Sequence, residues 1–266
     1  MTVSIFLDVD KTLTIKHIQA YYADALGCQA EYDAIEADFQ NKAISSREFG
    51  MKIIDLYASK GLNQNRAREI AKSVQLQPWT DELLRLDAKI FLVSTGPNYY
   101  IDQLAQEYRI PRDHVLCTNY FFEGTGGAIS RCDPCDEIQK ADWVKSKIRE
   151  NRHNYSIGVG DSPLLDGPFI ASCSIGFLIE PSDSHFFAPH FQAIIRHAKT
   201  MISLVETLSG DKDHAPVHLE EVPISKLYKR LTLGSWGIVI TVIAGAFALG
   251  VKFDDLMTGL QAFGAR

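Results

Sequence analysis

The sequence lacks an excess of positive charge. Its 27 lysines and arginines are outnumbered by 33 aspartates and glutamates, so the formal net charge is −6 at pH 7. Nucleic-acid phosphates require a basic protein surface, and the charge therefore argues against a nucleic-acid partner. At 266 residues, 46% of them hydrophobic, the chain can bury one substantial core and a small additional domain.

The sequence also lacks a signal peptide and a second pair of closely spaced cysteines. The five cysteines are odd in number and scattered, so we expect a reducing compartment for the part that carries them. Cys132 and Cys135 have the spacing of a zinc clip or a redox pair. A zinc site would need a second such pair, and a redox pair is typical of a helix start in a different fold. No role is assigned to these two thiols.

What the sequence does contain begins with two carboxylates at the end of an apolar run. Ile5-Phe6-Leu7 predicts a strand, and Asp8 and Asp10 follow it two residues apart. Side chains with that spacing point to the same side of an extended chain. Like charges that close repel each other unless a cation such as Mg²⁺, or a reacting phosphoryl group, lies beside them. Alone, the pair could equally be ordinary turn residues.

Two further apolar runs end in polar groups, at 89–93 and at 155–160. Continuous apolar runs of this length are typical of buried parallel strands. A hydroxyl and backbone amides follow the first run and can hold phosphate oxygens, and carboxylates follow the second. The polar residues at these two strand ends are Ser94, Thr95, Gly96, Asp161 and Asp166.

A helix is predicted from Asp136 onward, with a lysine in its first turn. Its apolar positions recur at helical spacing. Lys140 opposes the helix dipole, which favours acidic groups at the amino end, so the position needs another reason. Balancing the carboxylates is one reason, and a solvated surface lysine is the alternative. The apolar positions are Ile138, Ala141, Val144 and Ile148.

Together the four motifs resemble the haloacid dehalogenase superfamily of aspartate-nucleophile phosphotransferases. The motifs are Asp-x-Asp-x-Thr at 8–12, Ser-Thr-Gly at 94–96, Lys140, and Gly-Asp-x-x-x-x-Asp at 160–166. Their spacing and the Glu-Ile-Gln-Lys segment that ends at Lys140 look most like the phosphoserine phosphatase branch. The resemblance covers roughly residues 1 to 200, and it implies a doubly wound α/β fold with a parallel sheet.

This resemblance implies a role for each motif residue. Asp8 would attack phosphorus and become an aspartyl phosphate. Asp10 would protonate the leaving oxygen and then deprotonate the hydrolytic water. Mg²⁺ would be held by the Asp8 carboxylate, the Asp10 carbonyl and Asp161. Ser94, Thr95, Gly96 and Lys140 would bind the phosphate, and Thr12 and Asp166 would support the site, Asp166 by positioning Lys140 or the metal's water.

Two other members of the superfamily fit less well. Asp10-Lys11-Thr12 also resembles the phosphorylated motif of cation-pumping ATPases, in which Asp10 would be the nucleophile and Thr12 would take the acid-base position. The chain is far too short for a pump. A dehalogenase needs no proton on its leaving halide, so Asp10 would have no task there.

Residues 16–78 are predicted to form a helical insertion. Ser45 and Glu48 form a capping box for a helix that Gly61 is placed to end, and Asn63 could cap the next one. In the superfamily such an insertion is a mobile cap that closes over the site and excludes water, which suits small substrates. A glycine-containing hairpin is predicted at 120–130.

The substrate is less well defined. Phosphoserine phosphatases carry an acidic residue shortly after the first motif, where this chain has Lys16 and His17. Their cap arginine also has no clear counterpart near Ile53. Lys16 and His17 could instead favour a substrate with another anionic group, although a lone histidine is more often structural.

Far downstream, 21 residues without a charge, 231–251, lie between Arg230 and Lys252. That length spans the hydrocarbon core of a bilayer as one helix, whereas a buried helix of a soluble fold is the alternative. The upstream flank is the more basic, so we expect a single-pass membrane protein with a cytoplasmic catalytic part. The expected parts are a core at 1–15 and 79–200, a cap at 16–78, a linker at 201–230, a transmembrane helix at 231–251 and a tail at 252–266.

The sequence thus predicts an Mg²⁺-dependent phosphatase acting on a small phosphomonoester, phosphoserine-like or related. A phosphotransferase or mutase of the same superfamily would pass the phosphoryl group to another acceptor. A membrane-tethered binding module without turnover is the alternative outside enzymes, and the intact motifs argue against it. The oligomeric state does not follow from the sequence.

Overall fold

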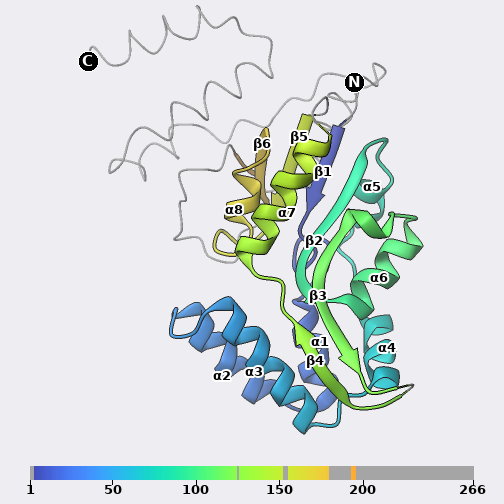
Figure 1. Cartoon of the computed structure of the whole chain (residues 1–266), viewed down its shortest axis with the longest axis vertical. Helices are drawn as coiled ribbons and strands as arrows, with labels where there is room; N and C mark the ends of the chain where they lie inside the picture. The colour runs from blue at the N-terminus through green and yellow to red at the C-terminus, as the bar shows by residue number, and fades with distance from the viewer. Residues whose placement is uncertain (1–2, 125, 152–154, 180–192, 196–266) are drawn as a thin grey trace, which may run out of the picture.

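The computed structural model describes residues 3–124, 126–151, 155–179 and 193–195. They form an α/β fold around a seven-stranded sheet of strand order β4-β3-β2-β1-β5-β6-β7 (Figure 1). All neighbouring strands are parallel except β3 and β4, which are antiparallel. The strands are β1 (Val3–Leu7), β2 (Lys89–Pro97), β3 (Val115–Phe122), β4 (Ile129–Asp133), β5 (Tyr155–Gly160), β6 (Ile175–Ile179) and β7 (Ala193–Ile195).

The three predicted strands are confirmed as β1, β2 and β5, and they are adjacent in the sheet. β1 lies between the other two and pairs with β5 along its whole length and with β2 from residue 4 onward. Every side chain of β1 is buried, which explains why its sequence is a continuous apolar run and not an alternating one. The predicted hairpin at 120–130 is also confirmed, because β3 pairs with β4 there.

Helices cover both faces of the sheet. Phe6 points to the face that α7 and α8 cover, and its neighbours Ile5 and Leu7 point to the face of α5 and α6. The α-helices are α1 (Ile18–Leu26), α2 (Gln29–Gln40), α3 (Ser46–Ser59), α4 (Gln64–Ser73), α5 (Thr80–Leu84), α6 (Asn98–Glu107), α7 (Glu137–Glu150) and α8 (Gly167–Ile170), with a 3-10 turn η1 (Arg112–His114).

Five helices, α1 to α5, lie between β1 and β2 in the sequence, and α1 to α4 fall within the insertion predicted at 16–78. The capping box of Ser45 and Glu48 is present at the start of α3, and Asn63 caps α4 by accepting the Arg66 N–H. α3 ends at Ser59, two residues before Gly61, whose φ of 74° suits glycine.

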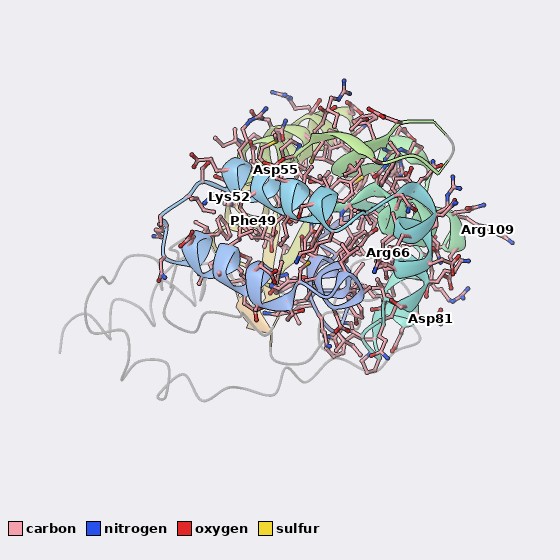
Figure 2. All side chains as sticks on the ribbon, turned by 90° about the horizontal axis from the view of Figure 1, so that it is seen from below. Phe49, Lys52, Asp55, Arg66, Asp81 and Arg109 are labelled. Atoms are coloured by element: carbon pink, nitrogen blue, oxygen red, sulfur yellow. The ribbon has the colours of Figure 1, made fainter. Side chains whose placement is uncertain are left out.

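α2 and α3 pack side by side at the lower end of the sheet (Figures 1 and 2). The rings of Phe39 on α2 and Phe49 on α3 have centroids 5.1 Å apart. Lys52 Nζ on α3 lies 3.8 Å from a carboxylate oxygen of Asp38 on α2. An apolar contact and an ion pair therefore join these two helices.

One expectation about α7 is wrong. Ala141 and Val144 are buried as predicted, but Ile138 is 64% exposed. Lys140 is fully buried and shares the inward face of the helix with Ala141 and Val144. Ile138 is two positions before Lys140 and therefore lies away from that face. Its helical spacing from Ala141 did not mean that it is buried.

The predicted membrane helix at 231–251 lies outside the described residues, as do the linker at 201–230 and the tail at 252–266. Among the residues that are described, no helix has the length and apolar character to cross a membrane.

Candidate active site

The polar residues predicted at the strand ends converge at the carboxyl edge of the sheet. Asp8 follows β1, Ser94 lies within the last part of β2, and Asp161 follows β5. Because β2, β1 and β5 are parallel neighbours, their ends deliver these side chains to one place. The Asp8 N–H donates to the Val159 carbonyl at 2.8 Å, which fixes the first carboxylate against the neighbouring strand.

Lys140 joins two of the buried carboxylates. Its ammonium donates to Asp8 Oδ1 and to Asp166 Oδ1, each at 2.7 Å. All three side chains are at most 4% exposed. A capping box of Asp136 and Gln139 begins α7 and so sets the position of Lys140 in the first turn. The expectation that this lysine balances the carboxylates agrees with the geometry.

Both carboxylate oxygens of Asp166 accept a hydrogen bond from the protein. Oδ1 accepts from Lys140, and Oδ2 accepts the Ser162 N–H at 2.9 Å. Although Asp8, Asp161 and Asp166 are close enough together to hold a metal ion as a group, these hydrogen bonds indicate that Asp166 orients Lys140 and the 161–166 loop.

Asp8 and Asp161 each keep an oxygen available. Asp8 Oδ2 and Asp161 Oδ2 are buried and have no hydrogen-bond partner within the described part of the chain. A buried carboxylate oxygen without a partner is costly, and a hard divalent cation satisfies such oxygens well. The residues present therefore fit Mg²⁺, with Asp8 and Asp161 as the side chains that would hold it.

Asp10 is oriented by three neighbours on the other side of the site. Its Oδ1 accepts the Ile18 N–H at 2.5 Å, and its Oδ2 accepts the Ser94 hydroxyl at 3.0 Å. Ser94 Oγ in turn accepts the Gly96 N–H at 2.9 Å. The Ser94 hydroxyl, predicted to bind phosphate, thus donates to Asp10 in this structure.

A side chain at position 96 would require its neighbours to shift. A Cβ there would lie 2.7 Å from Asp10 Oδ2 and 2.9 Å from Ile18 Cδ1. The Thr95 carbonyl accepts the Thr118 hydroxyl at 2.7 Å, which ties the motif to β3. Thr12 is fully buried, its hydroxyl has no partner among the described residues, and its carbonyl accepts the Trp79 indole N–H at 3.2 Å.

The electrostatics of the cluster favour a bound cation. Burial, followed by the charge of Asp166, raises the pKa of Asp8 well above its usual value, and Lys140 opposes that rise. Burial and Asp166 likewise raise the pKa of Asp161 to about 7. Burial opposes the charge on Lys140, but Asp166 and Asp8 together raise the pKa of the ammonium. The single positive charge of Lys140 is therefore not enough to offset the three buried carboxylates of Asp8, Asp161 and Asp166.

One residue at the site had no role in the sequence analysis. Lys11 Nζ lies 3.6 Å from Asp161 Oδ2. Its place inside the first motif was the available signal, but sequence spacing does not show where a loop side chain reaches.

His17 and Lys16 follow this loop. His17 Nε2 lies 3.7 Å from a Glu36 carboxylate oxygen, and the Lys16 ammonium lies 5.8 Å from the Tyr21 ring centroid.

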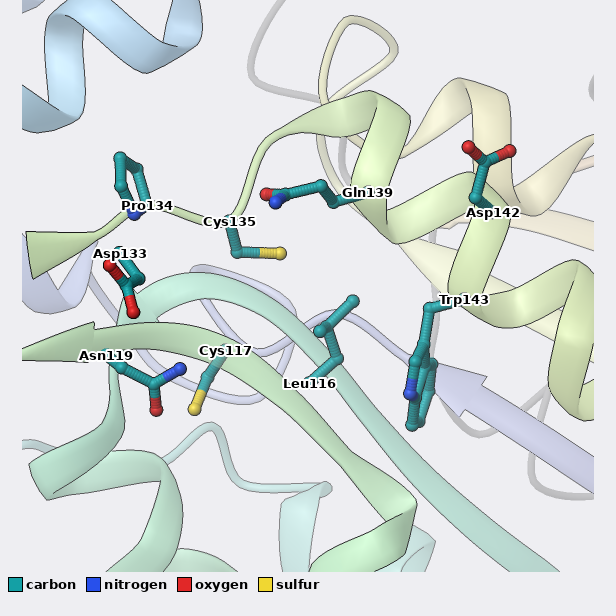
Figure 3. A pocket seen from close by; sticks show the side chains of 9 residues that line it. All are labelled: Leu116, Cys117, Asn119, Asp133, Pro134, Cys135, Gln139, Asp142 and Trp143. Atoms are coloured by element: carbon teal, nitrogen blue, oxygen red, sulfur yellow. The ribbon is translucent and has the colours of Figure 1, made fainter.

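Cys132 and Cys135 differ in their surroundings, and only Cys135 is close enough to Lys140 and Asp8 for their charges to affect its pKa. Cys132 pairs with Tyr120 across the β3–β4 ladder, whereas Cys135 follows β4 and lines a pocket of about 350 Å³ together with Cys117 and Trp143 (Figure 3). Both thiols of the pair are free, and burial raises the pKa of each to about 12. Protonated thiols are poor nucleophiles and poor metal ligands.

Several solved structures are similar to this chain in fold. A HAD family hydrolase from Salmonella enterica serovar Typhi is 13% identical with a TM-score of 0.61; the match covers 68% of this chain and 64% of that one. A substrate-bound phosphoserine phosphatase is 12% identical with a TM-score of 0.61, covering 76% and 98%. A phosphoserine phosphohydrolase-like protein from Francisella tularensis is 18% identical with a TM-score of 0.58, covering 77% and 99%. At these identities the likeness shows the fold alone.

The sequence itself decides the family. No curated protein matches the chain. The family model of haloacid dehalogenase-like hydrolases matches residues 5–170, which is more than half of the chain and contains all four motifs. The chain belongs to the haloacid dehalogenase-like hydrolase family.

Proposed function

We propose that the protein is an Mg²⁺-dependent phosphatase that hydrolyses a small phosphomonoester through an aspartyl phosphate on Asp8. The observation that carries the proposal is that the two oxygens of the Asp8 carboxylate have different surroundings. Asp8 Oδ1 accepts a hydrogen bond from Lys140, whereas Asp8 Oδ2 is buried and has no partner among the described residues. A carboxylate fixed through one oxygen is held in a defined orientation, as in-line attack on phosphorus requires.

The neighbours of Asp8 supply the remaining steps. The Asp8 carboxylate attacks phosphorus, and the leaving oxygen takes a proton from Asp10, which is held in place by Ile18 and Ser94. Asp10 then accepts a proton from the water that hydrolyses the aspartyl phosphate. Lys140 and the amides around Gly96 stabilise the phosphoryl oxygens. Mg²⁺, when held by Asp8 and Asp161, neutralises charge on those oxygens.

The residues around Asp10 favour a small substrate. α1 to α4, within the 16–78 insertion, would act as the cap over the site. In this cap His17 Nε2 lies 3.7 Å from a Glu36 carboxylate oxygen. The proposed substrate is a small phosphomonoester, phosphoserine-like or related, and Lys16 and His17 favour one that carries another anionic group. A panel of zwitterionic, neutral and dianionic phosphomonoesters tests this, and a preference for neutral or zwitterionic esters over dianionic ones would argue against the anionic group.

The reaction is tested on the full chain with an aryl phosphate and several small phosphomonoesters, with and without Mg²⁺. Asp8→Asn should abolish phosphate release. Asp55→Asn, an equally conservative change at an exposed position on α3 (Figure 2), should leave the rate unchanged. Unchanged activity of Asp8→Asn, or activity that chelation of Mg²⁺ leaves intact, would contradict the mechanism. Transfer to added alcohols in place of phosphate release would favour a phosphotransferase.

The membrane part of the proposal depends on the sequence alone. We propose that 231–251 anchors the protein in a membrane with the catalytic part on the cytoplasmic side. Full-length protein should remain in the membrane fraction after alkaline carbonate extraction, and a chain ending at residue 230 should be released. Equal extraction of the two would argue against an anchor.

A further inference from the structure

Lys11 occupies an unusual backbone conformation at the edge of the carboxylate cluster. Its φ is 58°, in the left-handed region that non-glycine residues seldom adopt. The Lys11 N–H donates to Thr14 Oγ1 at 3.1 Å, which helps to hold the turn. Strained backbone of this kind persists where the surrounding structure enforces it, often at functional sites.

The Lys11 side chain reaches a buried carboxylate oxygen. Its ammonium lies 3.6 Å from Asp161 Oδ2, beyond hydrogen-bond distance but within ion-pair distance. That oxygen has no hydrogen-bond partner in the described part of the protein, and Asp161 is 2% exposed. Lys11 therefore forms the ion pair with this oxygen, whereas Lys140 donates to Asp8 and Asp166.

The two lysines of the site differ in their freedom to move. The Lys140 side chain is fully buried and makes two hydrogen bonds at 2.7 Å, so it is fixed. The Lys11 side chain is 31% exposed and makes a longer contact, so it can withdraw toward solvent. A divalent cation held by Asp8 and Asp161 would need the oxygen that Lys11 faces, and it would repel the ammonium.

We infer that Lys11 is a removable counter-ion of Asp161 that competes with the divalent cation. It stabilises the metal-free site by facing the unpartnered oxygen, and it leaves that oxygen when the cation binds. Lys11 thereby weakens metal binding while it protects the empty site from repulsion between carboxylates. The inference rests on the proposed Mg²⁺ site and assigns a positioning role, not a catalytic one.

Two measurements on the full chain test this, and their expected signs are opposite. Isothermal titration gives the Mg²⁺ dissociation constant, and urea unfolding in EDTA gives the stability of the metal-free protein. Lys11→Met should bind Mg²⁺ about 5-fold more tightly, because a partly exposed ion pair no longer has to be broken. The same variant should unfold at a lower urea concentration than wild type without metal.

Lys52→Met is the matched control, because Lys52 also forms a partly exposed ion pair, with Asp38 at 3.8 Å, but on α3. It should leave the Mg²⁺ dissociation constant unchanged. Lys11→Asn removes the same charge with a residue that tolerates left-handed backbone, so it serves if Lys11→Met folds poorly. It too should bind Mg²⁺ more tightly than wild type.

The outcomes separate this inference from the proposed function. If wild type binds Mg²⁺, Asp161→Asn loses the binding, and neither Lys11 variant binds more tightly, the counter-ion role is wrong and the metal site stands. Weaker binding together with lower stability in the Lys11 variants would mean a purely structural role and would also overturn the inference. If wild type binds no Mg²⁺, the proposed metal site fails, and the inference fails with it.

Discussion

Replacing Lys140 by methionine should destabilise the protein strongly, because one side chain compensates two buried carboxylates. Its ammonium is fully buried and lies 2.7 Å from both Asp8 Oδ1 and Asp166 Oδ1. Removing one partner of a buried ion pair costs about 3–5 kcal/mol, since the other charge stays buried without compensation. With two carboxylates left, we expect a loss at the upper end of that range, about 5 kcal/mol, at pH 7.5.

The loss should depend on pH with a definite sign. Without Lys140 the folded-state pKa of Asp8, already raised by burial, rises further, so the folded variant binds more protons than its unfolded chain. Stability then falls as pH rises. The difference between variant and wild type should therefore be smaller at pH 5 than at pH 7.5. Adding Asp166→Asn to Lys140→Met removes one uncompensated charge and should restore part of the stability.

Urea unfolding in EDTA at the two pH values measures the effect, provided that the denaturant dependence is unchanged. Lys145→Met is the control on the same helix. Lys145 forms an exposed pair with Asp142 at 3.8 Å, and its loss should cost at most about 0.5 kcal/mol. A loss below about 1 kcal/mol for Lys140→Met at pH 7.5, or an equal loss at both pH values, would refute the electrostatic reasoning.

Three further predictions concern neighbouring parts of the molecule. Gly96→Ala places a Cβ 2.7 Å from Asp10 Oδ2, so phosphate release should slow about 100-fold while circular dichroism shows a folded protein; an unchanged rate would contradict the close fit. The pKa of Asp161 is raised from 3.8 to about 7, so metal-free stability should fall by about 4 kcal/mol between pH 4 and 7, and Asp161→Asn should flatten this slope in urea titrations. Ile53→Ala on α3, at a fully buried position, should cost about 2–5 kcal/mol by urea unfolding, and a loss under 1 would argue against that packing.

The strands that carry the site could be predicted from the sequence because strands buried on both faces have recognisable apolar sequences. β1 and β5 are covered on both faces, and such strands read as apolar runs that stop where the chain reaches the polar edge. The position of Lys140 was predictable for a different reason. A cation in the first turn conflicts with the helix dipole, and the conflict pointed to a compensating interaction that the structure contains.

Other parts of the site depend on contacts that no local pattern encodes. The first half of β3, before residue 120, pairs with β2, and this long-range pairing was not predicted. The 2.5 Å hydrogen bond from the Ile18 N–H to Asp10 and the reach of Lys11 to Asp161 follow from the path of the β1–α1 loop. That path includes a left-handed residue, which a lysine does not signal in a sequence.

The central place of β1 has a consequence for how the molecule fluctuates. β1 is hydrogen-bonded along both edges, to β2 and β5, so it cannot detach without breaking two ladders at once. Its amide protons should exchange with solvent only when the whole domain unfolds, whereas helices α2 and α3, which pack at one end of the sheet, can open locally. Asp8, the proposed nucleophile, thus directly follows the segment that opens last, and its geometry survives local opening of the helices around it.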